Sequence, residues 1–107
     1  MARTYVINSP VLSAFGRWRF QGPLEVSLAR SVLKDGFLSA VGHQASARFL
    51  SHALGMEIPV NRVRIAMEPG DRALVLRLNA RLPEGSLLSE SEMDELPFDL
   101  GLLEREE

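Results

Sequence analysis

Residues 36–55 read GFLSAVGHQASARFLSHALG, a short apolar run that leads through a glycine into a longer amphipathic segment. The run at 37–41 has the composition of a buried strand, and Gly42 permits a turn after it. Apolar residues then recur at helical spacing over 43–54, and Gly55 is a typical helix C-cap. This stretch therefore predicts a strand, a tight turn and a helix in succession.

The chain before this stretch predicts two strands and a further helix. Residues 2–8 are rich in β-branched and aromatic side chains, and the strand that they predict ends before Pro10. Residues 16–21 alternate aromatic with arginine side chains, which predicts a short half-buried strand. Leucine or valine at every fourth position predicts a helix over 24–34.

The chain after this stretch predicts a β-hairpin and a short helix. Residues 61–67 and 72–80 each alternate apolar with other side chains, and a Glu-Pro-Gly-Asp turn separates the two segments. Ser89 precedes Glu92 by three residues, which is the spacing of a helix capping box.

Taken together, these elements predict a single α/β domain over residues 1–107. We expect a small mixed β-sheet of about five strands with helices packed mainly on one face. The length suits one compact core and is too short for two domains. The acidic residues at about 97–107 are expected to form a frayed C-terminal tail.

The net charge of −2 conceals two oppositely charged parts of the chain. Residues 1–81 hold 11 of the 12 basic residues and five acidic ones, whereas residues 82–107 hold nine acidic residues and Arg105. All the basic residues except Lys34 are arginine, which suits bidentate recognition of phosphate. A codon usage that favours arginine would give the same composition, so composition alone leaves both explanations open.

Arginine also gathers on one face of the predicted hairpin. Arg62 and Arg64 come from its first strand, and Arg77 and Arg81 come from its second. Such a face could bind an anion, or it could be an ordinary solvated outer face. The sequence by itself does not separate these two interpretations.

Several classes of site are disfavoured. The absence of cysteine excludes disulfides, thiolate nucleophiles and cysteine-based metal sites, and there is no glycine-rich nucleotide loop. His43 and His52 are nine residues apart, which places them on opposite sides of a helix, so they cannot share a metal ion. We therefore expect no metal and no cofactor. Without a signal peptide or an apolar run of ~20 residues, a soluble cytoplasmic protein of a prokaryotic cell is expected.

His43 is the residue that most strongly suggests chemistry. It follows Gly42 at the start of the predicted helix, where backbone N–H groups without partners favour a bound phosphate. An imidazole at that position can reach such a phosphate, but a lone histidine can equally be a cap or a half-buried residue. The residues alone thus indicate anion or nucleic-acid binding and no more.

Four sequence motifs together are more specific than the composition. They are Asn8-Ser9-Pro10, the segment from Gly36 to His43, Asn61-Arg62-Val63 and Arg81-Leu82-Pro83-Glu84-Gly85. In this order and at these spacings the chain resembles the viral ring nucleases that act as type III anti-CRISPR proteins, and their bacterial relatives in CRISPR loci or mobile elements. The resemblance covers nearly the whole chain, to about residue 96.

The resemblance implies an activity and a set of site residues. Members of that family are homodimers that bind cyclic tetra-adenylate across the subunit interface and linearise it without a metal ion. Position by position, the resemblance makes His43 the general acid, Arg81 a phosphate-binding residue and Glu84 an active-site carboxylate. It makes Asn8 and Arg62 ligand contacts.

Two positions depart from the pattern of that family. Gln44 follows the histidine where relatives often carry an acid, and Arg77 stands where a neutral polar residue can occur. We count both as ligand-binding residues and expect them to bear on adenine contacts and ring-size preference.

The implied reaction suits RNA, because the ribose 2′-hydroxyl supplies the nucleophile. The protein has to align that oxygen with the leaving 5′-oxygen, while Arg81 offsets phosphoryl charge and His43 protonates the leaving group. The expected products are linear adenylates that end in a 2′,3′-cyclic phosphate, and Glu84 either orients the sugar or tunes His43.

The alternatives to a nuclease are a protein that sequesters the messenger, a nucleic-acid-binding accessory protein and a structural dimer. Duplex DNA is not an expected partner, because the last 26 residues are acidic.

Overall fold

The computed structural model describes residues 2–8, 14–78 and 89–107, apart from the side chain of Glu90. The elements in chain order are β1 (Thr4–Ile7), β2 (Trp18–Gln21), α1 (Val26–Leu33), β3 (Leu38–Ser39), α2 (Gln44–Leu54), β4 (Arg72–Leu78), α3 (Glu90–Glu95) and β5 (Phe98–Arg105). None of the helices within these ranges is long and apolar enough to cross a membrane.

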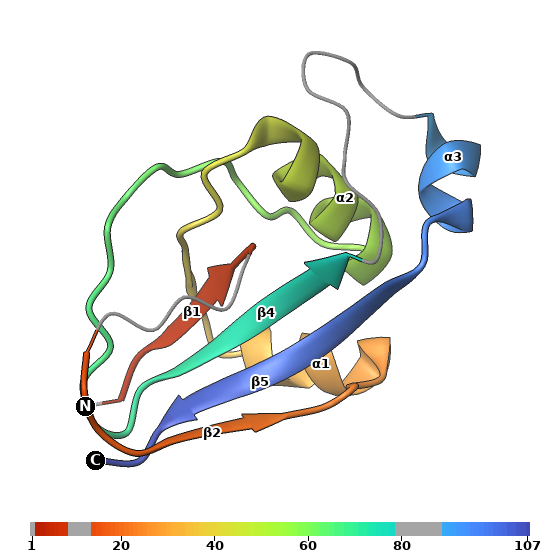
Figure 1. Ribbon diagram of the computed structural model, residues 1–107. Coiled ribbons are helices and arrows are strands. Elements are labelled where there is room, and N and C mark those ends of the chain that lie inside the picture. Colours follow the sequence, from red (N-terminus) through yellow and green to blue (C-terminus); the bar gives the residue numbers. More distant parts are fainter. Residues whose placement is uncertain (1, 9–13, 79–88) are drawn as a thin grey trace.

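The five strands form one mixed sheet in the order β2-β5-β4-β1-β3. β1 pairs in parallel with both β3 and β4, whereas β5 pairs antiparallel with β4 and β2. Figure 1 shows α1 and α2 together behind the sheet, with α3 beyond the end of β4. The predicted α/β class, with about five strands and helices mainly on one face, is confirmed.

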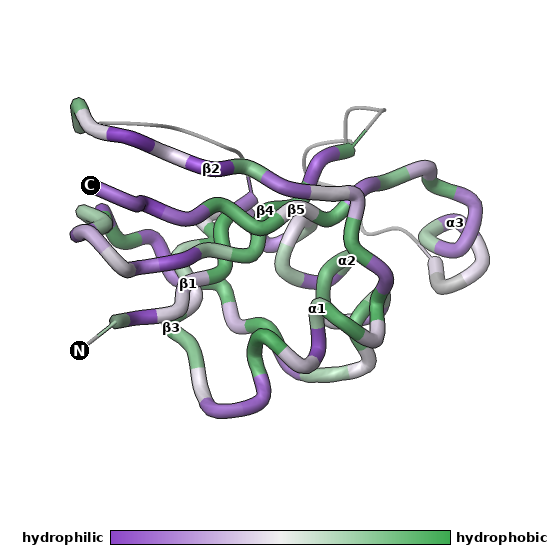
Figure 2. The backbone as a smooth tube through the Cα atoms, turned by 90° about the horizontal axis from the view of Figure 1, so that it is seen from below, coloured by the Kyte–Doolittle hydropathy of each residue, from purple (hydrophilic) through white to green (hydrophobic). Residues whose placement is uncertain are grey.

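The main hydrophobic core lies between the sheet and the two longer helices. Figure 2 shows hydrophobic residues in the middle of β4 and β5, and hydrophilic residues toward the C-terminus. Phe49 of α2 is 1% exposed and meets Phe98 of β5 edge to face, with the ring centroids 5.1 Å apart. Most buried members of this core come from β1, α1, α2, β4 and β5 and include Val6, Ala29, Leu33, Leu50, Leu54, Leu74, Leu76 and Leu100, and Met93 comes from α3.

The capping residues and apolar spacing in the sequence predicted the helices correctly. α2 ends at Leu54 and is capped by Gly55, whose backbone is left-handed with φ 64°, as the C-cap prediction requires. Ser89 caps α3 through a complete capping box with Glu92. The predicted helix at 24–34 is observed as Val26–Leu33.

The predicted hairpin of 61–67 with 72–80 is wrong. Residues 61–69 form no strand, and β4 pairs instead with β1 and β5, so both of its edges are occupied. Ile65 and Met67 lie over the face of the sheet that the helices leave open, against a second core cluster that includes Tyr5 and Val75. Their alternation therefore reflects a segment that covers a sheet face.

The predicted frayed tail at about 97–107 is also wrong. Residues 98–105 are β5, which pairs with a strand on each side. Leu100 and Leu103 of this strand are buried, which anchors it in the sheet. The exposed Glu107 pairs with Arg17 at 2.7 Å, so even the terminal residue has a partner. The acidic composition predicted a frayed tail, whereas pairing with two distant strands makes this segment part of the sheet.

Candidate functional site

The carboxyl ends of the parallel strands define the edge of the sheet that carries His43. Because β1, β3 and β4 run in parallel, the residues that follow them share one edge. Asn8 follows β1 directly, and the segment that leads to His43 follows β3. In open α/β sheets, ligands bind outside the carboxyl ends of the strands. A ligand site is therefore expected at this edge of the sheet.

His43 occupies the N-cap position of α2. Its backbone is extended, with φ −120° and ψ 130°, and its carbonyl oxygen accepts the first helical hydrogen bond from Ala47 at 3.0 Å. The side chain is exposed, and it forms no cap hydrogen bond. The N–H groups of the first helical turn have no partner within the helix and begin at an exposed imidazole, which is an arrangement that suits a phosphate.

Arg62 is fixed directly beside this helix end. Its Nε donates to the carbonyl oxygen of Gly42 at 2.8 Å, while the side chain as a whole stays exposed. The terminal guanidinium nitrogens form no hydrogen bond to any residue that the structure describes, so they can bind an oxyanion. Since Gly42 is the residue before His43, Arg62 is bonded to the backbone one residue before the imidazole-bearing N-cap of α2.

Asn61 and Ser39 hold the Arg62 segment in place. The Asn61 backbone N–H donates to the Val41 carbonyl at 2.8 Å, and its side-chain amide donates to the Ser39 carbonyl at 2.7 Å. The Ser39 hydroxyl donates in turn to the carbonyl of Pro59 at 2.6 Å. This clamp positions Arg62, and it could not be predicted from the sequence. The only sequence signal was Asn61, within the Asn-Arg-Val motif.

The other predicted site residues fall in three places. Gln44 is exposed at the first helical position, next to His43, and Asn8 is half-buried at the same sheet edge. Arg77 is exposed on β4, on the face that carries Ala73 and Val75 and not on the face that packs against α2.

Arg81 and Glu84 lie outside the described residues. The hypothesis of one arginine platform on a hairpin is wrong, because Arg62 does not lie on a strand.

His52, at the other end of α2, has a structural contact. Its Nε2 lies 2.6 Å from a carboxylate oxygen of Asp94 in α3, and its side chain is 27% exposed. This pair joins the two helices far along the helix from His43. Among the side chains in the described ranges, no cluster of three histidine or acidic groups could hold a metal ion.

Comparison with known proteins places the chain in a family. The family model described as STIV B116-like matches residues 4–100. The chain belongs to the STIV B116-like family. Protein 26 of Sulfolobus islandicus filamentous virus is 35% identical over 83 residues, which are 76% of this chain and 70% of that protein. ORF117 of Acidianus two-tailed virus is 43% identical over 70 residues, which are 64% of this chain and 60% of that protein.

The chain is also similar to a solved structure and to a bacterial protein. B116 of Sulfolobus turreted icosahedral virus superimposes with a TM-score of 0.78 at 21% identity, over 97% of this chain and 100% of that one. YddF of Bacillus subtilis is 30% identical over 92% of this chain and 94% of its own length. The relatives are therefore largely viral, and the B116 likeness supports the fold described above.

Proposed function

We propose that this member of the STIV B116-like family is a metal-independent ring nuclease that cleaves cyclic tetra-adenylate and so switches off type III CRISPR signalling. One observation carries the proposal. The exposed imidazole of His43 stands at the N-cap of α2, and the Nε of Arg62 donates to the carbonyl oxygen of the preceding residue, Gly42. Such a site offers a proton donor and positive charge to a single phosphodiester.

The reaction uses the nucleophile of the substrate itself. The ribose 2′-oxygen attacks the adjacent phosphorus, its proton passes to solvent, and the bond from phosphorus to the 5′-oxygen breaks. His43 donates a proton to that departing oxygen, which is a step worth about 10²–10⁴-fold in rate. The products are a 5′-hydroxyl and a 2′,3′-cyclic phosphate, so no hydrolytic water is needed in this step.

Positive charge and alignment account for the rest of the catalysis. Arg62 offsets the charge that develops on the phosphoryl oxygens, and the N–H groups of α2 add to this effect. We assign Arg81 to the same task and Glu84 to the sugar or to the orientation of His43. Gln44 and Asn8 contact the ligand from the same sheet edge.

The proposal includes a homodimer. A cyclic tetranucleotide has rotational symmetry of its own, and a two-fold dimer presents two copies of His43 symmetrically to it. Each half of the ring then meets one imidazole. The same reaction would serve a virus that inhibits type III CRISPR immunity or a host that switches off its own signalling.

The nature of the product tests the proposal. Mass spectrometry of a reaction with cyclic tetra-adenylate should show linear adenylates that carry a 2′,3′-cyclic phosphate. A ring without the attacking 2′-hydroxyls should bind and remain whole. Products that end in a 3′-hydroxyl would contradict the chemistry, and tight binding without any product would identify a protein that sequesters the messenger instead.

A further inference from the structure

A second site lies at the opposite end of the same sheet edge. Where β2 departs from β5, a cavity of about 170 Å³ is lined by Phe20, Gln21, Gly22, Pro23, Arg77, Asp99, Leu100 and Gly101. Ligand pockets usually measure about 300–1,000 Å³, so this cavity suits one part of a ligand and not a whole nucleotide. A volume of this size suits a site for one ring.

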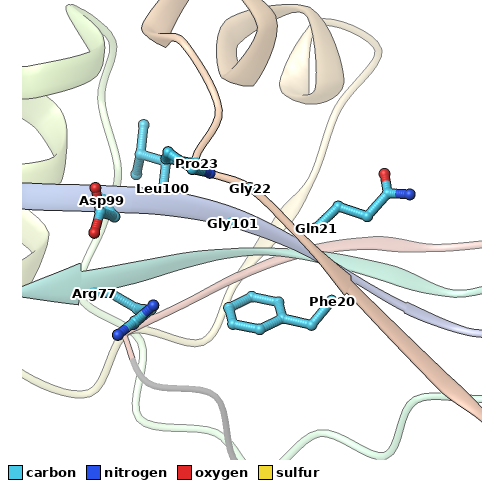
Figure 3. A pocket seen from close by; sticks show the side chains of 8 residues that line it. All are labelled: Phe20, Gln21, Gly22, Pro23, Arg77, Asp99, Leu100 and Gly101. Carbon is cyan, nitrogen blue, oxygen red and sulfur yellow. The ribbon is translucent and has the colours of Figure 1, made fainter.

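Phe20 provides an aromatic surface in this cavity. The side chain is 45% exposed although it belongs to a strand, and its register partner is the buried Leu103. The ring lies against the backbone of Gly101, where an added Cβ would collide with it. Figure 3 shows the ring extending toward Arg77, whereas Gln21 points the other way. One side of an aromatic ring is thus supported by protein and the ring remains accessible.

Arg77 and Asp99 supply polar groups at the same place. They are direct register partners across β4 and β5, so their side chains emerge on one face of the sheet. Despite their opposite charges, neither side chain forms an ion pair or a hydrogen bond with any other residue in the ranges described. Asp99 is half-buried and Arg77 is exposed. An acceptor and a donor are therefore both available to a ligand beside the Phe20 ring.

We propose that Phe20, Arg77 and Asp99 form an adenine-binding subsite. An aromatic ring for stacking and polar groups for the base edge are the means by which proteins hold single bases. The carboxylate of Asp99 only accepts hydrogen bonds, which matches the exocyclic amine of adenine. The choice of adenine rests on the proposed function, because an oligoadenylate carries no other base.

The position of the subsite suits a ligand longer than one nucleotide. Asp99 stands near the start of β5, opposite the end of β4, so the subsite shares the sheet edge that carries His43. β5 and β3 are three strand intervals apart, or about 14 Å at the usual spacing. Adenine in the subsite therefore belongs to a different nucleotide from the one whose phosphate meets His43. The subsite contributes to ligand binding and not to bond cleavage.

Steady-state kinetics with cyclic tetra-adenylate test this role. Phe20→Ala should raise KM about fivefold or more, as expected for a lost base stack, and leave kcat at saturation unchanged. Phe20→Tyr, which keeps the ring, should restore KM, and this rescue separates stacking from misfolding. Arg19→Ala, in which an exposed neighbour is changed, should have no effect. An unchanged KM in Phe20→Ala would overturn the proposal.

Direct titration separates the subsite from the reaction. Adenosine 5′-monophosphate should shift the backbone amide resonances of Gln21 and Gly101, and purine riboside 5′-monophosphate, which lacks the amine, should bind more weakly. Asp99→Asn should remove this difference. Shifts at these residues without ring cleavage would refute the nuclease and keep the subsite. Ring cleavage without these shifts, or preferred binding of guanosine 5′-monophosphate, would refute the subsite.

Discussion

The bond from Arg62 to Gly42 shows how one backbone carbonyl can set up a phosphate site. It holds the Nε of Arg62 on the carbonyl oxygen of the residue before His43 and leaves the two terminal nitrogens for a ligand. The sequence predicted His43 and Arg62 as site residues, but it placed Arg62 on a strand. The clamp through Asn61 and Ser39 joins residues that are far apart in the sequence, so no local sequence pattern predicts it.

Arg62→Ala should weaken binding of the cyclic ligand. A charge-assisted hydrogen bond contributes about 1.5–3 kcal/mol, so KM should rise about tenfold or more. The matched control is Arg64→Ala, which removes the same charge from an exposed side chain two residues away. Kinetics that show equal losses in both variants would indicate a general effect of charge and would contradict a specific role for Arg62.

Asp71 is a buried carboxylate whose two oxygens are both used. One accepts from the backbone N–H of Arg3 at 2.8 Å and the other from that of Glu68 at 2.9 Å. Asp71→Ala leaves two backbone donors unsatisfied and should lower the free energy of unfolding by about 1–3 kcal/mol in urea titrations. The exposed Asp35→Ala is the control, and equal stability of the two variants would refute this role.

Among the elements, the helices followed from local signals and the strands only in part. Periodicity and caps depend on neighbours in sequence, which is why α2 and the capping box of α3 were foreseen. The pairing partner of a strand depends on residues that are far away in the sequence. Residues 61–67 were therefore predicted to pair with β4, whose two edges are in fact occupied by β1 and β5. The acidic residues of β5 led to the prediction of a frayed tail in place of a strand.

The capping box of α3 gives a pH dependence with a defined sign. Hydrogen bonds from the backbone N–H of Ser89, and then from its side chain, lower the pKa of Glu92 below its ordinary value of 4.5. The folded state thus favours the ionised carboxylate. Its contribution to stability is present above pH 4.5 and is lost as the pH falls through the lowered pKa.

Glu92→Gln should therefore be less stable than the wild type at pH 7, and the difference should vanish below the lowered pKa. Urea unfolding over this pH range measures it. Glu95→Gln, at the other end of α3, is the control and should not reproduce that pattern. A difference that persists in strong acid would contradict the linkage.

The whole molecule depends on its C-terminal strand. β5 joins β2 to the rest of the sheet, and Leu100 and Leu103 are buried. Truncation after Leu96 should abolish cooperative unfolding in circular dichroism, whereas truncation after Arg105 should cause a small loss through the exposed Arg17–Glu107 pair. A folded protein without residues 97–107 would contradict the topology.

The fold class and the location of His43 could be predicted from the sequence, because strand, glycine and helix follow one another along the chain. The cavity at Phe20 could not, since it needs the pairing of β4 with β5 and of β5 with β2. Arg77 was singled out from the arginine face of a hairpin that does not form and from the resemblance. The structure places it with Asp99, on the face away from α2.

Cleavage of cyclic tetra-adenylate in excess EDTA, followed over time, tests the role of His43 most directly. The wild type and His52→Gln, a variant of the other histidine on the same helix, should both linearise the ring. His43→Ala should bind it and leave it intact. Cleavage by His43→Ala at the wild-type rate, or cleavage that stops when EDTA is added, would contradict the mechanism.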